Sequence, residues 1–127
     1  MFTVLYRNCP FIVKIMASIS IEKNCLIFPD GVRVTFPFPV AEFIEFQPVV
    51  VVRLDVPIGK IFNENVFGVS ACGEIVWQIK RRKYVYENCP YMNLSRSNSN
   101  IVAHNWDCLD LVLDPKTGTV IETVHSK

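Results

Sequence analysis

The sequence predicts a mainly β fold: an antiparallel meander of short hairpins that forms a curled sheet, a sandwich or a half-barrel. Three observations support this prediction. Short runs of β-branched and aromatic residues recur along the chain, turns containing Gly or Pro separate them, and no stretch has the sustained periodicity of an amphipathic helix. The pattern corresponds to about nine or ten short strands joined by turns.

Composition sets the size and charge of this fold. The chain has 127 residues, of which 50% are apolar and 20% are charged, which suits one domain with a real core. Thirteen Lys and Arg residues against twelve Asp and Glu residues give a net charge of +1. There is therefore no overall field to attract nucleic acid or anionic lipid, and such a partner would need a local patch.

The first fifteen residues, MFTVLYRNCPFIVKI, differ from the rest of the chain. Arg7, Pro10 and Lys14 interrupt their apolar run, which is too short and too charged to span a bilayer. A signal peptide is the alternative, but Lys14 would fall within its apolar region. We expect residues 1–15 to be an N-terminal extension upstream of a true start at Met16, and residues 16–127 to form a single β-rich domain.

Three short strands are predicted next. Residues 19–22 alternate between apolar and polar side chains, and residues 25–28 form a second apolar run. Pro29-Asp30-Gly31 is a turn, because Pro fixes φ, Asp bonds back to the backbone and Gly supplies a positive φ. Residues 32–36 alternate as a half-buried strand does, and the prolines in 37–39 end that strand because they cannot donate to a ladder.

Residues 40–54 predict two further strands. Residues 40–47 fit a short helix or a strand, and the strand is favoured because β-branched and aromatic residues dominate. Val49 to Val52 and Leu54 form a continuous apolar run, which is typical of a central strand covered on both faces. Residues 55–64, which contain Pro57 and Gly59, form a loop.

The clearest hairpin lies at residues 65–79. Its two apolar runs flank the short Gly-containing break at residues 71–73. Ile75, Trp77 and Ile79 alternate with polar residues, so we expect all three on one buried face.

The remaining chain divides into a loop and a hairpin. Residues 80–100 are aromatic in their first half and rich in Ser and Asn in their second, without a lasting period, which predicts a long loop of functional or mobile character. Residues 101–124 alternate on both sides of the turn at 114–118 and form a second hairpin.

Four segments together resemble a family of small, uncharacterised bacterial β-rich proteins: NVFG at 65–68, GEIVWQI at 73–79, NWD at 105–107 and DLVLDPKTG at 110–118. The resemblance covers most of the chain after Met16 and implies no activity, cofactor or catalytic residue. Cys108 stands where the resemblance leads us to expect a glycine. Segments 68–79 and 111–123 also resemble blade hairpins of quinoprotein-type propellers. The chain is too short for a closed propeller, so this second resemblance implies shared hairpin physics only.

The cysteines indicate a compartment. Five are present, an odd number without a C-x-x-C pair, namely Cys9, Cys25, Cys72, Cys89 and Cys108. Neither a disulfide framework nor a zinc site is indicated. We therefore expect reduced thiols in a cytoplasmic protein.

A basic run at residues 80–83, followed by Tyr84 and Tyr86, is the best candidate for a ligand surface. Four cations beside two aromatic rings can bind phosphates and stack bases. The alternative is a solvated strand end whose charges keep a sheet edge soluble. The low net charge disfavours nucleic acid as the partner.

A second cluster contains His104, Asp107 and Cys108. A cysteine nucleophile needs a histidine base within hydrogen-bond reach, whereas His104 and Cys108 would lie roughly 13 Å apart on an extended strand unless the chain turns between them. No oxyanion-hole pattern accompanies them, so a strand histidine, a capped turn and a buried thiol are preferred. Cys72 and His125 could complete a metal site only by a convergence that the spacing does not predict, and we expect no metal and no cofactor.

These observations favour a small protein-interaction module, of which an immunity-type inhibitor of a toxin is one concrete version. Its partner would meet the loop at residues 80–100 and the Trp106 hairpin, where aromatic and Arg side chains suit an interface. The candidate binding residues are Arg81, Arg82, Tyr84, Tyr86, Tyr91 and Trp106. The alternatives are a small-molecule or nucleic-acid binding domain, or an enzyme using His104, Cys108 and Asp107. Self-association through an edge strand is a further alternative, and we expect no membrane partner.

Overall fold

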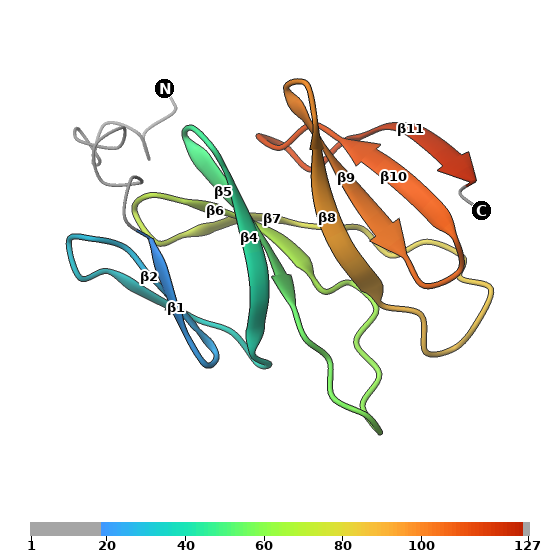
Figure 1. The fold of residues 1–127 in the computed structure, drawn as a ribbon, viewed down its shortest axis with the longest axis horizontal. Helices are drawn as coiled ribbons and strands as arrows, with labels where there is room; N and C mark the ends of the chain where they lie inside the picture. The colour runs from blue at the N-terminus through green and yellow to red at the C-terminus, as the bar shows by residue number, and fades with distance from the viewer. Residues whose placement is uncertain (1–18, 126–127) are drawn as a thin grey trace.

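The computed structural model describes residues 19–125, which form eleven strands in three antiparallel sheets (Figure 1). The mainly β, antiparallel prediction is thereby confirmed, and none of the three sheets closes into a barrel. In chain order the strands are β1 (Ser20–Glu22), β2 (Cys25–Ile27), β3 (Arg33–Thr35), β4 (Val40–Phe46), β5 (Val49–Leu54), β6 (Val66–Ser70), β7 (Ile75–Gln78), β8 (Tyr91–Ser97), β9 (Asn100–Asn105), β10 (Leu109–Leu113) and β11 (Val120–His125). The predictions for residues 1–15 and Met16 lie outside the described residues.

Each sheet is a contiguous meander. Strands pair in the orders β1-β2-β3, β4-β5-β6-β7 and β11-β10-β9-β8, so every hydrogen-bonded neighbour is the adjacent strand of the chain. We call these the first, middle and third sheets. Figure 1 shows them in a row, with the middle sheet between the other two.

The first sheet forms by the turn chemistry that the sequence predicts. The Asp30 carboxylate accepts a hydrogen bond from the Val32 N–H at 3.1 Å, and Gly31 has a φ of 93°. That positive φ favours glycine because a side chain would be strained there.

The middle sheet is covered on both faces. Along β5, Val50, Val52 and Leu54 belong to one buried cluster, which also contains Leu26 of the first sheet and Phe28 just after β2. Val49 and Val51 belong to a second buried cluster shared with the third sheet. The continuous apolar run is therefore a central strand, as predicted, and residues 40–46 are a strand as favoured.

The 65–79 hairpin is present as β6 and β7, but its apolar face is not the predicted one. Trp77 and Ile79 are buried, whereas Ile75 is 48% exposed. The register shifts here, because Gly68 pairs with Trp77 while Val69 pairs with Ile75. The extra residue is a β-bulge, and it turns Ile75 to the face opposite Trp77.

The predicted long loop at residues 80–100 is wrong in its second half, because β8 and the first residue of β9 lie there. The irregular segment is confined to residues 79–90. A register shift between Tyr91 and Asn93 places an extra residue in β8, so its buried side chains, Tyr91 and Leu94, do not alternate as a regular strand predicts. The final hairpin is confirmed as β10 and β11, and every residue of β11 is exposed.

Polar contacts join the middle and third sheets around the second cluster. The Trp77 indole N–H donates to the Pro115 carbonyl oxygen at 2.7 Å, which ties β7 to the β10–β11 turn. The Glu42 carboxylate on β4 accepts from Arg53 Nε at 2.6 Å and from the Leu94 N–H of β8 at 3.1 Å. These polar groups thus have partners at the junction, which lets the two sheets pack closely.

Candidate protein-binding surface

Three connections converge at one end of the middle and third sheets: the β5–β6 loop (55–65), the β7–β8 loop (79–90) and the β9–β10 turn (106–108). We call this the loop end. Asn63 joins the first two connections. Its amide donates to the Glu87 carbonyl oxygen at 2.8 Å, and its side-chain oxygen accepts from the Cys89 N–H at 2.7 Å.

Two buried asparagines continue this attachment. The Asn65 amide donates to the carbonyl oxygens of Leu54 and Tyr91 at 2.9 and 3.0 Å, and its oxygen accepts from the Tyr91 N–H at 2.9 Å. The Asn105 amide donates to the Cys89 carbonyl oxygen at 2.9 Å, and its oxygen accepts from the Cys89 thiol at 2.8 Å. The end of the β7–β8 loop is therefore fixed by asparagine side chains, which bond to backbone N–H and C=O groups as a neighbouring strand would.

The β9–β10 turn projects Trp106 from the loop end. The Cys108 N–H donates to the Asn105 carbonyl oxygen at 3.0 Å, and Cys108 has a φ of 68°. This left-handed position is where the sequence leads us to expect a glycine, so the turn forms with a cysteine in the glycine position. Trp106 occupies the corner and is 56% exposed, while its backbone N–H donates to the Pro90 carbonyl oxygen at 3.1 Å.

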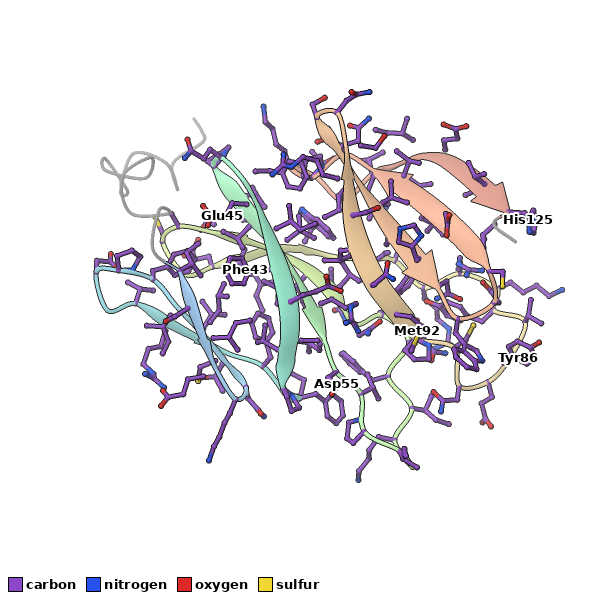
Figure 2. The ribbon with its side chains drawn as sticks, viewed as in Figure 1. Phe43, Glu45, Asp55, Tyr86, Met92 and His125 are labelled. Atoms are coloured by element: carbon purple, nitrogen blue, oxygen red, sulfur yellow. The ribbon has the colours of Figure 1, made fainter. Side chains whose placement is uncertain are left out.

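An apolar hollow of about 320 Å³ lies between these connections. Ile58 is fully exposed at its rim, and the bulge in β8 turns Met92 outward, next to the buried Tyr91. Figure 2 shows Met92 close to where the loops meet, with Tyr86 beyond it on the β7–β8 loop. The lining residues are Val56, Pro57, Ile58, Asn88, Pro90, Met92 and Trp106.

The basic run is divided between the surface and the interior. Arg82 Nη2 donates to both carboxylate oxygens of Asp107 at 3.1 Å, and its guanidinium carbon lies 4.7 Å from the centre of the Tyr84 ring. The Asp107 side chain is almost fully buried, so this cation is used within the chain. None of the ion pairs among residues 19–125 involves Lys80, Arg81 or Lys83.

Tyr84 and Tyr91 lie behind this run. The Tyr84 hydroxyl donates to the Glu64 carboxylate at 2.7 Å. Burial, and then that hydrogen bond, raises the pKa of Tyr84 far above its ordinary value. Tyr91 is fully buried, and burial raises its pKa as well. Both phenols therefore stay neutral near pH 7.

The six predicted binding residues thus fall into three groups. Arg81, Tyr86 and Trp106 are exposed at the loop end. Arg82 and Tyr84 are partly buried and bonded to acidic side chains. Tyr91 is completely buried, so its predicted contact with a partner is wrong for this structure. Ile58 and Met92 were missed because an exposed apolar residue in a loop and an outward bulge residue have no distinctive sequence pattern.

The histidine cluster is arranged differently from the prediction. Asp107 contacts Arg82 rather than His104. The ring of His104 instead lies between Asp110, at 2.9 Å from Nδ1, and Ser95, whose hydroxyl is 2.9 Å from Nε2. Among residues 19–125 no group of three or more His, Cys, Asp or Glu side chains is placed to hold a metal ion.

The cysteines also differ from expectation at one position. Cys72 is disulfide-bonded, so the prediction of reduced thiols is wrong there. Cys25, Cys89 and Cys108 are thiols. Burial raises the pKa of Cys89, which keeps it a neutral donor to Asn105.

Comparison with known proteins places most of this chain in one family. The model of the Domain of unknown function (DUF7957) matches residues 16–125. The chain belongs to the DUF7957 family. No curated protein matches it.

The DUF7957 fold has a counterpart among solved structures. The crystal structure of the computationally designed Ika8 protein is similar with a TM-score of 0.54 and 13% sequence identity, over 86% of this chain and 36% of that one. This chain thus spans about a third of the length of the designed protein. At this identity the likeness concerns the fold alone.

Within this DUF7957 domain, the four segments noted in the sequence each supply one anchor of the fold: Asn65, Trp77, Asn105 and Gly118. Residues 19–125 contain no helix that is long and apolar enough to cross a membrane.

Proposed function

We propose that this domain is a protein-interaction module whose binding surface is the loop end. The observation that carries the proposal is the hollow of about 320 Å³ with the exposed Ile58, Met92 and Trp106 at its rim. Exposed apolar patches with polar margins are typical of interaction sites, and Trp is among the residues that most often anchor interfaces.

The attachment of the loops supports this proposal. Asn63, Asn65 and Asn105 hold the walls of the hollow through hydrogen bonds of 2.7–3.0 Å. A fixed surface loses little conformational entropy on association, so more of the contact energy appears as affinity. We infer that the site is built before the partner arrives.

Charge defines the chemistry of the partner. Lys80, Arg81 and Lys83 are exposed on the β7–β8 loop, whose later residues Asn88 and Pro90 line the apolar hollow. The complementary partner is an acidic protein segment that presents a large apolar side chain to the hollow. An immunity-type inhibitor that covers an acidic toxin surface is one such arrangement.

Nucleic acid is the less favoured ligand. Arg82 is used by Asp107 and its guanidinium lies over the Tyr84 ring, which removes one cation and one ring face from the phosphate-binding and base-stacking set. We also propose a cytoplasmic location, because three of the four cysteines in residues 19–125 are thiols and only Cys72 is disulfide-bonded, whereas small secreted domains usually pair their cysteines.

The test is quantitative affinity purification of the tagged domain from cells that produce it. We expect one or more proteins to be enriched by the wild type and lost with Trp106→Ala and with Arg81→Glu. Arg82→Glu is unsuitable because it breaks the pair with Asp107. Melting temperatures should stay within about 2 °C of the wild type, because both altered side chains are exposed.

Two matched controls make the same kinds of substitution, loss of an exposed apolar side chain and reversal of an exposed charge, away from the loop end. Ile75→Ala removes an exposed apolar side chain from the middle sheet, and Lys116→Glu reverses an exposed charge in the β10–β11 turn. Both should retain the partner. Equal capture of the partner by Trp106→Ala and by the wild type would contradict the proposal. If the wild type retarded single-stranded DNA in a gel and the two binding variants did not, the nucleic-acid alternative would be favoured.

A further inference from the structure

A hydrogen-bonded line of three side chains crosses the outer face of the third sheet, close to the β9–β10 turn. Ser95 on β8, His104 on β9 and Asp110 on β10 come from three adjacent strands. Their neighbours Leu94, Ala103 and Leu111 point into the second buried cluster, so the three polar side chains point outward.

Strand register places them in contact. His104 lies directly opposite Asp110, and Ser95 is diagonal to it because Ser95 pairs with Val102. Side chains at these positions are within reach across an antiparallel pair. The resulting distances are 2.9 Å from Asp110 Oδ1 to His104 Nδ1, and 2.9 Å from His104 Nε2 to Ser95 Oγ.

The order of the contacts has a chemical meaning. A carboxylate on Nδ1 holds the proton there, which leaves Nε2 as the acceptor for the serine hydroxyl. The Asp110 side chain is 15% exposed and the His104 side chain 32%, so the pair is partly shielded while the imidazole stays accessible. A hydroxyl that is hydrogen-bonded to an imidazole, which is in turn hydrogen-bonded to a carboxylate, is the arrangement of an activated nucleophile.

We propose that Ser95 is a nucleophile that accepts acyl groups from activated esters, with His104 as its base and Asp110 as a positioning residue. Ser95 Oγ bonds to the acyl carbon while its proton passes to His104 Nε2. The ester C–O bond breaks, and the departing alcohol takes that proton. Water then attacks the acyl carbon while its proton passes to His104 Nε2, the bond from Ser95 Oγ to the acyl carbon breaks, and Ser95 Oγ takes that proton as the carboxylic acid leaves.

A donor for the developing oxyanion is also close in register. Asn93 lies directly opposite His104, two residues before Ser95 on the same strand, and its side chain is exposed. An asparagine amide in such a position can stabilise a tetrahedral intermediate. The open face suits small acyl groups or an acyl group presented on a larger molecule.

The alternative is a polar ladder that only stabilises the sheet, and reactivity separates the two. The probe is a fluorophosphonate, which forms a P–O bond with a nucleophilic serine and releases fluoride. We expect mass spectrometry to place the adduct on Ser95 about 100-fold faster than on Ser97. Ser97 is the internal control, because it is exposed on the same strand without a histidine partner among residues 19–125.

Variants assign the roles. Ser95→Ala should abolish the adduct, and His104→Gln, which keeps a polar side chain on β9, should slow labelling to the rate at Ser97. Asp110→Asn should slow it at least tenfold and Asp110→Glu should restore part of the rate, whereas a merely structural carboxylate would change the melting temperature without this rescue. p-Nitrophenyl acetate should give a burst of nitrophenol with the same dependence. Equal labelling of Ser95 and Ser97, or no adduct on Ser95 in the folded wild type, would overturn the proposal.

Discussion

Three asparagine side chains, those of Asn63, Asn65 and Asn105, make the hydrogen bonds near the end of the β7–β8 loop that backbone groups would make in a sheet. Each amide both donates to and accepts from main-chain or thiol groups near the end of the β7–β8 loop. An unsatisfied buried amide costs about 1–3 kcal/mol, so these contacts fix the loop strongly. Sequence reasoning could not assign this role, because asparagine is equally common in exposed turns.

Tyr84 provides a prediction at the scale of one residue. Its pKa is raised in the fold, whereas in the unfolded chain a tyrosine ionises near pH 10. The stability that depends on the neutral phenol is therefore complete below about pH 10 and lost as the pH rises above it. The free energy of unfolding, measured in urea between about pH 8 and pH 11, should fall over the upper part of this range.

Tyr84→Phe should make that alkaline decline shallower, because it removes the phenol that must ionise. The raised pKa of Tyr91 should preserve part of the decline in this variant. Tyr86→Phe changes an exposed tyrosine and serves as the control, with a decline like that of the wild type. A wild-type free energy that stays constant up to pH 11 would contradict the prediction.

At the scale of elements, Trp77 is enclosed by two glycines that belong to different hairpins. Gly68 lies opposite it on β6, and Gly118 lies in the β10–β11 turn, where an added Cβ would come 2.6 Å from Trp77 Cδ2. The indole N–H donates to Pro115 of the same turn. Hairpin 65–79 and hairpin 109–125 are therefore joined through one side chain.

Three alanine substitutions separate the two reasons why a glycine is needed, backbone strain and a clash with Trp77. Gly59→Ala meets nothing within 4 Å but has a φ of 91°, so it should cost about 1 kcal/mol through backbone strain alone. Gly68→Ala should cost about 3 kcal/mol through its clash with Trp77. Gly118→Ala has both a φ of 74° and the clash, and should be the most destabilising. Urea midpoints test the order, and a Gly68→Ala variant as stable as Gly59→Ala would contradict it.

The sequence predicted these hairpins well and their faces less well. Turn residues and alternation located β6, β7, β10 and β11, because those signals are local. The bulges at Val76 and Met92 were not predictable from alternation, since one additional residue reverses every later side chain. The actual partners of His104 were missed for a related reason: only the strand register brings Ser95 and Asp110 to it.

At the scale of the whole molecule, two cores share one sheet. Val51 and Val52 are consecutive and fully buried, yet they belong to different clusters. The apolar run made this central strand predictable, whereas the partner on each face was not, because the packing of separate sheets leaves no local signal. A sheet that is buried on both sides couples the two cores mechanically.

We therefore expect residues 19–125 to unfold in one cooperative step. Val51→Ala and Val52→Ala should each cost about 2 kcal/mol and shift the transition seen by far-ultraviolet circular dichroism and by Trp77 fluorescence equally. The measurement is made in a Trp106→Phe background so that Trp77 alone reports. If Val52→Ala shifted the dichroism transition but left the fluorescence transition in place, the cores would be independent.

The strictly sequential strand order has a consequence during synthesis. The first core needs only residues up to Ala71, so it can assemble early, while the opposite side of the middle sheet waits for Leu111 and Leu113. A nascent chain that has emerged to Ile79 therefore displays Val49, Val51 and Trp77 without their cover. The rate of translation through β8 to β10 determines how long this apolar surface can bind chaperones or associate wrongly with other chains.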